Sequence, residues 1–227
     1  MTNSALIIGA SRGLGRAMAE EYLKRGWDVV ATVRRADALA DLADRAGGKL
    51  EVELLDINEL DQVAALGGRL AGRSFDLLFV NAGILEHAEE TIGEVSTEGF
   101  TRMMVTNALS PMRVIEALQD LVSSTGTIGA MSSGLASIAD NEAGGYEVYR
   151  ATKAALNTLM RSYAARHKTG KRALVLMAPG WVRTDMGGPS APFSMEENVP
   201  KVVDALIAQA GKPGLRFVNY GGETLRW

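Results

Sequence analysis

The sequence predicts an α/β fold in which helices cover both faces of a parallel, doubly wound sheet of about seven strands. Short apolar runs alternate along the 227 residues with longer segments whose apolar residues recur at helical spacing. The runs are apolar on both faces, which suits a parallel sheet covered on both sides rather than an open antiparallel one. Repeated strand–helix–strand order implies right-handed crossovers and therefore a doubly wound sheet.

Seven stretches are predicted as strands because they are short and apolar. They are ALIIG (5–9), DVVATV (28–33), LEVELL (50–55), FDLLFV (75–80), GTIGAM (126–131), RALVLM (172–177) and, as a last strand, RFVNY (216–220). No linker, repeat or low-complexity segment separates them, so we expect residues 1–227 to form one domain.

Six further stretches have helical spacing, and several of them stop at glycine. They are 14–26, 36–48, 58–72, about 97–123, about 149–167 and 195–210. Residues 178–194 form the one long irregular stretch, which contains glycines and prolines. Such a segment is typical of a lid, which we expect at about 184–197.

The composition excludes several classes of site. The net charge of −3 gives no basic field for nucleic acid, and the lack of cysteine excludes disulfides, thiolate nucleophiles and cysteine-bound zinc. The two histidines, His87 and His167, lie far apart, so we expect no metal site. The N-terminus lacks a signal-peptide pattern, and no apolar run approaches the roughly 18 residues that span a bilayer. We therefore expect a cytoplasmic protein with no nucleic-acid or membrane partner.

The stretch GASRGLG at residues 9–15 fits two motifs. As G-x-S-x-G it would be a nucleophile elbow with Ser11 as nucleophile, but nothing upstream of this first strand supplies an oxyanion loop. As strand, turn and helix it fits a phosphate-binding turn, in which Gly9 ends the strand, Gly13 lets backbone approach a pyrophosphate and Gly15 allows helix–strand packing. Its spacing differs from G-x-G-x-x-G, so alone it is equally typical of a tight turn without a ligand.

Two further turns lie where predicted strands end. Asn81, Ala82 and Gly83 follow the fourth strand, at the switch point beside the first strand, where a turn can approach a ribose closely. Ser132 and Ser133 follow the fifth strand, where a hydroxyl can hydrogen-bond a substrate oxygen. Each alone is also typical of an ordinary turn.

Tyr149 and Lys153 lie one helical turn apart on the same face of a predicted helix. A tyrosine that works near neutral pH must have its pKa lowered from about 10 by about 3, which is ~4 kcal/mol. One cation at ~4 Å in an effective dielectric near 20 supplies about that much, so Lys153 is suited to the task. Tyr146, followed four residues on by Arg150, should face elsewhere. Asn107 is unfavourable inside a helix, so it either bonds a neighbour or serves function.

Together and in this order, these residues resemble the short-chain dehydrogenase/reductase family nearly end to end. The matching motifs are GASRGLG (9–15), Asp56, NAG (81–83), Asn107, Ser133, Tyr149-x-x-x-Lys153 and PGWVRT (179–184). The segments at 132–157 and 179–188 look particularly like the C-signal-like and sniffer-type carbonyl reductase branch. The resemblance implies a Rossmann-type fold that interconverts a carbonyl and an alcohol by hydride transfer.

The resemblance implies a catalytic set of Asn107, Ser133, Tyr149 and Lys153. Tyr149 would exchange a proton with the substrate oxygen, while Lys153 would lower its pKa and hold the nicotinamide ribose. Ser133, rather than Ser132, would position that oxygen, and Asn107 would hold a water in a proton relay. The segment from Gly187 to about Glu197 would close over substrate.

The resemblance also implies a cofactor site, with the adenine held by Asp56 and Ile57 and the carboxamide held by Val182 and Thr184. The full implied set is Gly9, Ser11, Arg12, Gly13, Leu14, Gly15, Arg34, Asp56, Ile57, Asn81, Ala82, Gly83, Tyr149, Lys153, Pro179, Gly180, Val182 and Thr184. Two positions depart from the family, because Ile8 stands for the usual Thr and Val80 for the usual Asn. The first and fourth strands should be neighbours, so we expect an apolar contact in place of a polar one.

The end of the second strand predicts which nicotinamide is bound. NAD enzymes carry an acidic residue there, whereas this strand is followed by Arg34 and Arg35. Arg12 matches a basic position that NADP-preferring members of the family use. Guanidinium groups suit a 2′-phosphate, although a solvated arginine is also typical of a strand end, particularly for Arg35. We therefore predict NADP(H) rather than NAD(H).

The leading functional hypothesis is an NADPH-dependent reductase of a small-molecule ketone or aldehyde, or the reverse oxidation. The alternative is a signalling or regulatory protein that binds the cofactor but whose biological role is not catalysis. Regulatory members of the family often lose the tyrosine and lysine, and both Tyr149 and Lys153 are present. A third reaction, epimerisation or dehydration, would need an extra acid or base with no clear candidate. For assembly, a homodimer, a homotetramer and a monomer all stay open.

Overall fold

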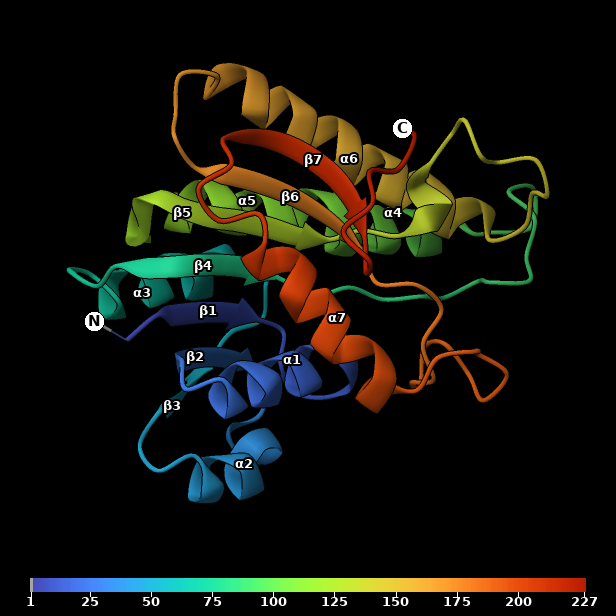
Figure 1. The fold of residues 1–227 in the computed structure, drawn as a ribbon. Coiled ribbons are helices and arrows are strands. Elements are labelled where there is room, and N and C mark those ends of the chain that lie inside the picture. Colours follow the sequence, from blue (N-terminus) through green and yellow to red (C-terminus); the bar gives the residue numbers. More distant parts are fainter. Residues whose placement is uncertain (1) are drawn as a thin grey trace.

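The computed structural model of the protein describes residues 2–227. One seven-stranded sheet runs through it in the order β3-β2-β1-β4-β5-β6-β7, and every neighbouring pair is parallel (Figure 1). The strands are β1 (Ser4–Ile8), β2 (Asp28–Val33), β3 (Leu50–Leu54), β4 (Phe75–Val80), β5 (Val122–Met131), β6 (Ala173–Ala178) and β7 (Gly214–Asn219). The predicted doubly wound parallel sheet is confirmed.

Helices cover both faces of the sheet (Figure 1). They are α1 (Gly13–Lys24), α2 (Ala40–Arg45), α3 (Leu60–Arg69), α4 (Thr97–Met104), α5 (Ser110–Leu118), α6 (Glu147–Arg166) and α7 (Met195–Ile207). Residues of α1, α2 and α7 pack into one buried apolar cluster, and those of α3, α5 and α6 into the other. Because strand side chains alternate, Leu6 and Ile8 of β1 join the second cluster while Ala5 and Ile7 join the first.

Several predicted element boundaries differ from the structure. The helical pattern expected over 97–123 is divided into α4, a π-helical turn at Val105–Leu109, α5 and a 3-10 turn at Gln119–Leu121. Strand β5 begins at Val122 rather than at 126, because the polar residues 123–125 carry no apolar signal. They lie where the β4–β5 register shifts, between the pairs Phe75–Val122 and Leu77–Thr127. At the other end of the chain, α7 begins at Met195, so residues 195–197 of the expected lid lie in its first turn.

The start of α7 is fixed by local sequence. The Ser194 hydroxyl accepts a hydrogen bond from the Glu197 backbone N–H at 3.2 Å, and the Glu197 carboxylate accepts one from the Ser194 N–H at 3.2 Å. This reciprocal capping box satisfies two otherwise unpaired donors of the first turn. The irregular segment after β6 therefore ends at Ser194.

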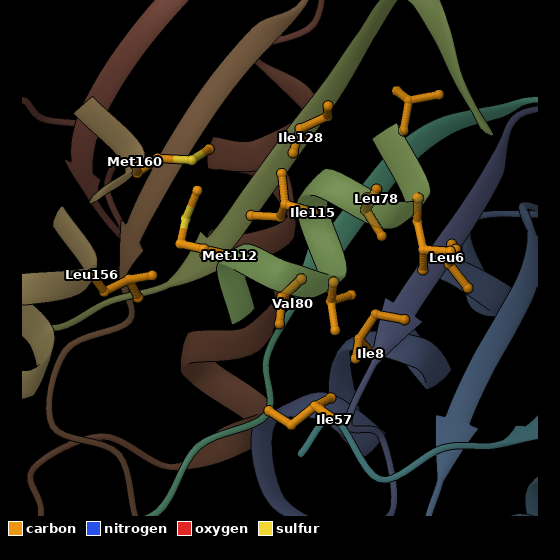
Figure 2. Packing of buried hydrophobic residues seen from close by; sticks show 14 of the residues in the cluster. Leu6, Ile8, Ile57, Leu78, Val80, Met112, Ile115, Ile128, Leu156 and Met160 are labelled. Carbon is orange, nitrogen blue, oxygen red and sulfur yellow. The ribbon is translucent and has the colours of Figure 1, made fainter. Parts of the chain in front are cut away.

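The expected contact between strands one and four is present. Ile8 and Val80 are partners in the β1–β4 register, and their side chains lie in the same buried cluster, 0% and 1% exposed (Figure 2). The apolar pair that replaces the family's polar residues is thus part of the core. Ile8 and Val80 are the last residues of β1 and β4, so the turns that follow these strands begin directly after the pair.

Val80→Asn alone should lower the free energy of unfolding by roughly 1–3 kcal/mol, because it buries an amide without a partner beside Ile8. Adding Ile8→Thr should recover part of this loss through a new hydrogen bond, with a coupling energy of at least about 0.5 kcal/mol. Urea unfolding of the two single variants and the double variant measures both quantities. Strictly additive effects would contradict a direct contact.

Candidate active site

The carboxyl ends of the central strands meet at one edge of the sheet, and the residues singled out from the sequence follow those ends. The strand order reverses between β1 and β4, which is the switch point where open α/β sheets bind ligands. The turn after β1 begins at Gly9, the turn after β4 begins at Asn81, and the turn after β5 contains Ser133. The structure therefore brings three separate motifs to one edge.

The turns after β1 and β4 pack against each other without space for side chains. Gly9 has a φ of 85° and its added Cβ would lie 2.7 Å from the Ala82 Cβ. A Cβ on Gly15 would lie 2.5 Å from the Asn81 Nδ2, and that amide donates to the Gly9 carbonyl at 2.9 Å. Gly9 and Gly15 are thus required by close approach. For Gly15 this agrees with the predicted packing role.

Gly13 differs from Gly9 and Gly15, because an added side chain at Gly13 would meet no close neighbour. Its φ is 56°, and the nearest atom to an added Cβ is the Thr184 Cγ2, 4.0 Å away. Helix α1 begins there, and Arg12 before it provides no side-chain cap. The first turn of the helix therefore has no side-chain cap, and uncapped N–H groups at a helix N-terminus suit an anion. The residues present fit the pyrophosphate of a dinucleotide.

At the proposed adenosine end, Arg34 and Asp56 line one hollow with a volume of about 630 Å³. One Asp56 carboxylate oxygen accepts from the Asn58 N–H at 2.9 Å. Ile57 is only 6% exposed and packs in the core cluster, so little of its side chain is available to a ligand. Arg34 is exposed, whereas Arg35 is paired with Asp37.

Arg12 has a partner that the sequence did not reveal. Its guanidinium forms an ion pair with Asp185, in the irregular segment after β6, and both side chains are largely exposed. This pair connects the residue before α1 with the predicted lid. An exposed pair of this kind contributes little to stability, so Arg12 is able to exchange Asp185 for another anion.

Tyr149, Ser133 and Lys153 converge at the end of β5. Burial raises the pKa of Tyr149 to about 12, while a hydrogen bond with the Ser133 side chain acts in the opposite direction. The Ser132 hydroxyl is buried and donates to the Asn157 Oδ1 at 2.7 Å, so it is occupied elsewhere. Of the two serines, Ser133 is the one that lies beside Tyr149.

Lys153 is buried with its ammonium group beside Tyr149. It is 3% exposed, its Nζ donates to the Met131 carbonyl at 2.9 Å, and it lies 5.7 Å from the Tyr149 ring centroid. Burial lowers the pKa of Lys153 to about 8. Burial is the largest influence on the pKa of Tyr149 in the chain alone. That Lys153 lowers this pKa stays a prediction.

Asn107 lies in the π-helical turn between α4 and α5 and is fully buried. Its Oδ1 accepts from the Ile84 N–H at 2.8 Å, and its Nδ2 donates to the Ile84 carbonyl at 2.8 Å and to the Thr152 hydroxyl at 3.1 Å. The side chain thus ties the segment after β4 to α6. Turns of this type are frequent at functional sites. Both Nδ2 hydrogens are donated, so a water held at Asn107 would have to donate to a remaining acceptor, either Oδ1 or the backbone carbonyl.

The remaining predicted residues follow β4 and β6. An added Cβ on Gly83 would lie 3.2 Å from the Asn107 Oδ1 and 3.4 Å from the Lys153 Nζ, so the turn after β4 packs closely against these two side chains. Pro179 accepts a hydrogen bond from the buried Asn198 of α7 at 2.9 Å. The Thr184 hydroxyl accepts from the Gly187 N–H at 3.0 Å, which shapes the first turn of the predicted lid.

Sequence reasoning missed several buried polar residues that support the site. Thr32 in β2 accepts from the Gly9 N–H at 3.0 Å, and Thr152, Asn157 and Asn198 hold Asn107, Ser132 and Pro179 respectively. Each is a polar residue at a core position of an apolar pattern. That signal was available in the sequence, although it does not identify the partner.

The chain matches the short chain dehydrogenase family over residues 3–193. It belongs to this family. Two solved structures with NADP are similar to this chain. One is a putative short-chain dehydrogenase/reductase from Burkholderia multivorans, which is 56% identical with a TM-score of 0.97. The other is a carbonyl reductase from Pseudomonas aeruginosa, which is 40% identical with a TM-score of 0.93. Both similarities cover 100% of each chain.

The expected branch of the family is also represented. The carbonyl reductase Sniffer of D. melanogaster is 29% identical, with a TM-score of 0.91 over 100% of both chains. The C-signal protein of Myxococcus xanthus is 32% identical over 67% of this chain and 92% of its own length. The chain is thus an oxidoreductase of the short-chain dehydrogenase type, similar to carbonyl reductases.

Two further observations concern the whole described chain. No helix within residues 2–227 has the length and apolar character needed to cross a membrane. In the same residues, histidine, aspartate and glutamate side chains form no group of three or more that could hold a metal ion.

The lowered pKa of Lys153 predicts a pH-dependent stability. The folded chain binds this proton less tightly, with a pKa of about 8 against 10.5 when unperturbed, so unfolding takes up a proton between these values. Stability should therefore rise with pH across this window, on the order of 3 kcal/mol in total, relative to Lys153→Met. Urea unfolding of both chains at several pH values in the window measures the difference. A difference that is constant with pH would exclude a buried, titrating Lys153.

Proposed function

We propose that this protein is an NADP(H)-dependent oxidoreductase that interconverts a ketone or aldehyde and an alcohol, with Tyr149 as general acid and base. The observation that carries the proposal is the convergence of Tyr149, Ser133 and Lys153 at the end of β5, beside the glycine turn that suits a dinucleotide. Similarity to carbonyl reductases supports the same chemistry. Bound NADPH would supply the hydride.

Tyr149 and Ser133 would act on the substrate oxygen. With a pKa of about 12, the phenol keeps its proton at neutral pH and is therefore ready to donate it to a carbonyl oxygen. Ser133 would hold that oxygen by a hydrogen bond, which fixes the geometry of proton transfer. In the reverse direction, phenolate must form, and the buried positive charge of Lys153 favours it.

Lys153 would also hold the cofactor ribose, and the buried Asn107 would hold a water in the proton relay to solvent. The glycine turn would bind the pyrophosphate through Gly9, Ser11, Gly13, Leu14 and Gly15. The turns after β4 and β6 would complete the site through Asn81, Ala82, Gly83, Pro179, Gly180, Val182 and Thr184. We propose that the segment around 184–197 closes over the substrate, and the exposed Trp181 and Met186 suit an apolar molecule.

The preference for NADP(H) would come from Arg34 and Arg12. Arg34 is exposed and lines the same hollow as Asp56, so it is positioned for the 2′-phosphate of a dinucleotide whose adenine lies there. Arg12 would release Asp185 to contact the same phosphate. NADP in two similar structures supports this preference. We further propose a cytoplasmic location. A signalling role is the second candidate function, because the chain is similar to the C-signal protein.

Tyr149→Phe should keep NADPH binding and lose carbonyl reduction by at least roughly 100-fold, because the proton donor is removed while the cofactor contacts are kept. NADPH affinity by fluorescence titration and turnover over a panel of ketones, aldehydes and quinones measure the two properties. Turnover that survives in the variant would remove Tyr149 as the acid. If the cell needs the protein but tolerates Tyr149→Phe, the signalling role is favoured.

Arg34→Ala should weaken NADPH binding by roughly tenfold or more and leave NADH binding unchanged, because only NADPH carries the 2′-phosphate. Arg35→Ala is the matched control, since Arg35 is the neighbouring arginine and is already paired with Asp37. Titration of both variants with both cofactors gives the comparison. Equal weakening of NADPH and NADH by Arg34→Ala would contradict the 2′-phosphate role.

A further inference from the structure

The segment that connects Ser133 to α6 is long and poorly supported by regular structure. After a short 3-10 turn at Gly134–Ala136, residues 138–146 are exposed and form neither helix nor strand. This segment, residues 134–146, is called the connecting loop below. It joins the two side chains that must meet at the substrate oxygen, so something must fix its conformation.

The end of the connecting loop near Tyr149 is held by Arg150. Its guanidinium donates to the Gly145 carbonyl at 2.9 Å and to the Gly144 carbonyl at 3.0 Å. The end near Ser133 is held by the serine itself, whose hydroxyl accepts from the Leu135 N–H at 3.1 Å. Neither contact reaches the middle of the loop.

The middle of the loop is held by residues 224–227, called the brace below. The Ala139 N–H donates to the Trp227 carbonyl at 3.0 Å, and Arg226 forms an ion pair with Asp140. Ser137 adds to this cluster, because its hydroxyl donates to the Asp140 carboxylate at 2.7 Å. The hydrogen bond from Ser137 and then the ion pair with Arg226 hold the pKa of Asp140 below its usual range.

The brace is itself fixed to the sheet and to the catalytic helix. Leu225 N–H donates to the Phe217 carbonyl of β7 at 2.9 Å, and the Trp227 ring lies 5.6 Å from the Phe217 ring. On its other side, the Trp227 ring lies 4.6 Å from the Arg161 guanidinium of α6. In Figure 1 the chain end lies beside α6 and the connecting loop. Trp227 therefore contacts the loop that follows Ser133 and the helix that carries Tyr149.

We propose that Arg226 and Trp227 are positioning residues that keep Ser133 within hydrogen-bonding reach of Tyr149. This inference rests on the proposed function for its catalytic consequence. Two backbone hydrogen bonds connect Ser133 with the residues that the brace holds. The Ala136 N–H donates to the Ser133 carbonyl at 3.0 Å, and the Ser137 N–H donates to the Gly134 carbonyl at 3.1 Å. The loop from Ser133 to Asp140 is therefore one hydrogen-bonded unit. Fixing Asp140 fixes that unit.

The first test needs no substrate. Hydrogen exchange on the whole chain with bound NADPH compares wild type, Trp227→Ala and Arg226→Ala, with Arg73→Ala as the control that breaks a similar exposed ion pair, to Glu51, at the far edge of the sheet. We expect amides of residues 135–141 to exchange roughly tenfold faster or more in both brace variants and to be unchanged in the control. Unchanged exchange there in the brace variants would overturn the proposal.

The second test separates positioning from a general loss of stability. The brace variants should lower kcat by about 10- to 100-fold and leave the NADPH dissociation constant unchanged, because the glycine turn lies elsewhere. Arg226→Lys should restore most of kcat, since it keeps the charge opposite Asp140. In a Ser133→Ala background, the brace variants should have little further effect, because the residue through which they act is absent.

The outcomes distinguish the two proposals. Full additivity between Trp227→Ala and Ser133→Ala would overturn the positioning role even if exchange increases. Weakened NADPH binding in proportion to kcat would do the same, since it indicates general destabilisation. If wild type reduces no carbonyl, the proposed function fails, and hydrogen exchange alone decides whether the brace holds the loop.

Discussion

The buried ammonium of Lys153 is the constraint on which the rest of the site depends. It is 3% exposed and donates to the Met131 carbonyl at the end of β5. An ion in such a place is costly unless polar groups surround it, so the carboxyl ends of the strands must converge there. Gly83 leaves room for it, and Tyr149 one turn earlier is held beside it. The same convergence creates the edge at which a dinucleotide and a small molecule would meet.

Buried polar contacts, rather than the apolar core, set the geometry of this edge. The core clusters on the two faces hold the sheet and helices together and tolerate the Ile8–Val80 replacement. In contrast, Asn107 connects the segment after β4 to α6 through three hydrogen bonds. Groups of this kind are costly to leave unpaired, so they specify one arrangement. Buried hydrogen bonds therefore fix the site's geometry, and the apolar core supports the strands and helices that carry them.

Much of this could be predicted from the sequence, and the exceptions have physical causes. The strands, their parallel order and the convergence of Ser133, Tyr149 and Lys153 follow from periodicity, topology and the family resemblance. The π-helical turn at Asn107 could not be predicted, because it depends on partners distant in the chain. The pairing of Arg12 with Asp185, 173 residues apart, is likewise non-local. The burial that raises the pKa of Tyr149 could not be predicted either, because the spacing of Tyr149 and Lys153 indicates a shared helix face but not its burial.

Direct hydride transfer between a nicotinamide and a carbonyl carbon is the chemical step that distinguishes the proposed reductase from a cofactor-binding signalling protein. The wild-type protein would be incubated with NADPH that carries deuterium at both nicotinamide C4 positions and with a set of ketones and aldehydes, and the products would be analysed by mass spectrometry. We expect an alcohol with deuterium on the former carbonyl carbon. Tight binding of NADPH without label in any product would contradict the proposed hydride transfer and favour the signalling role.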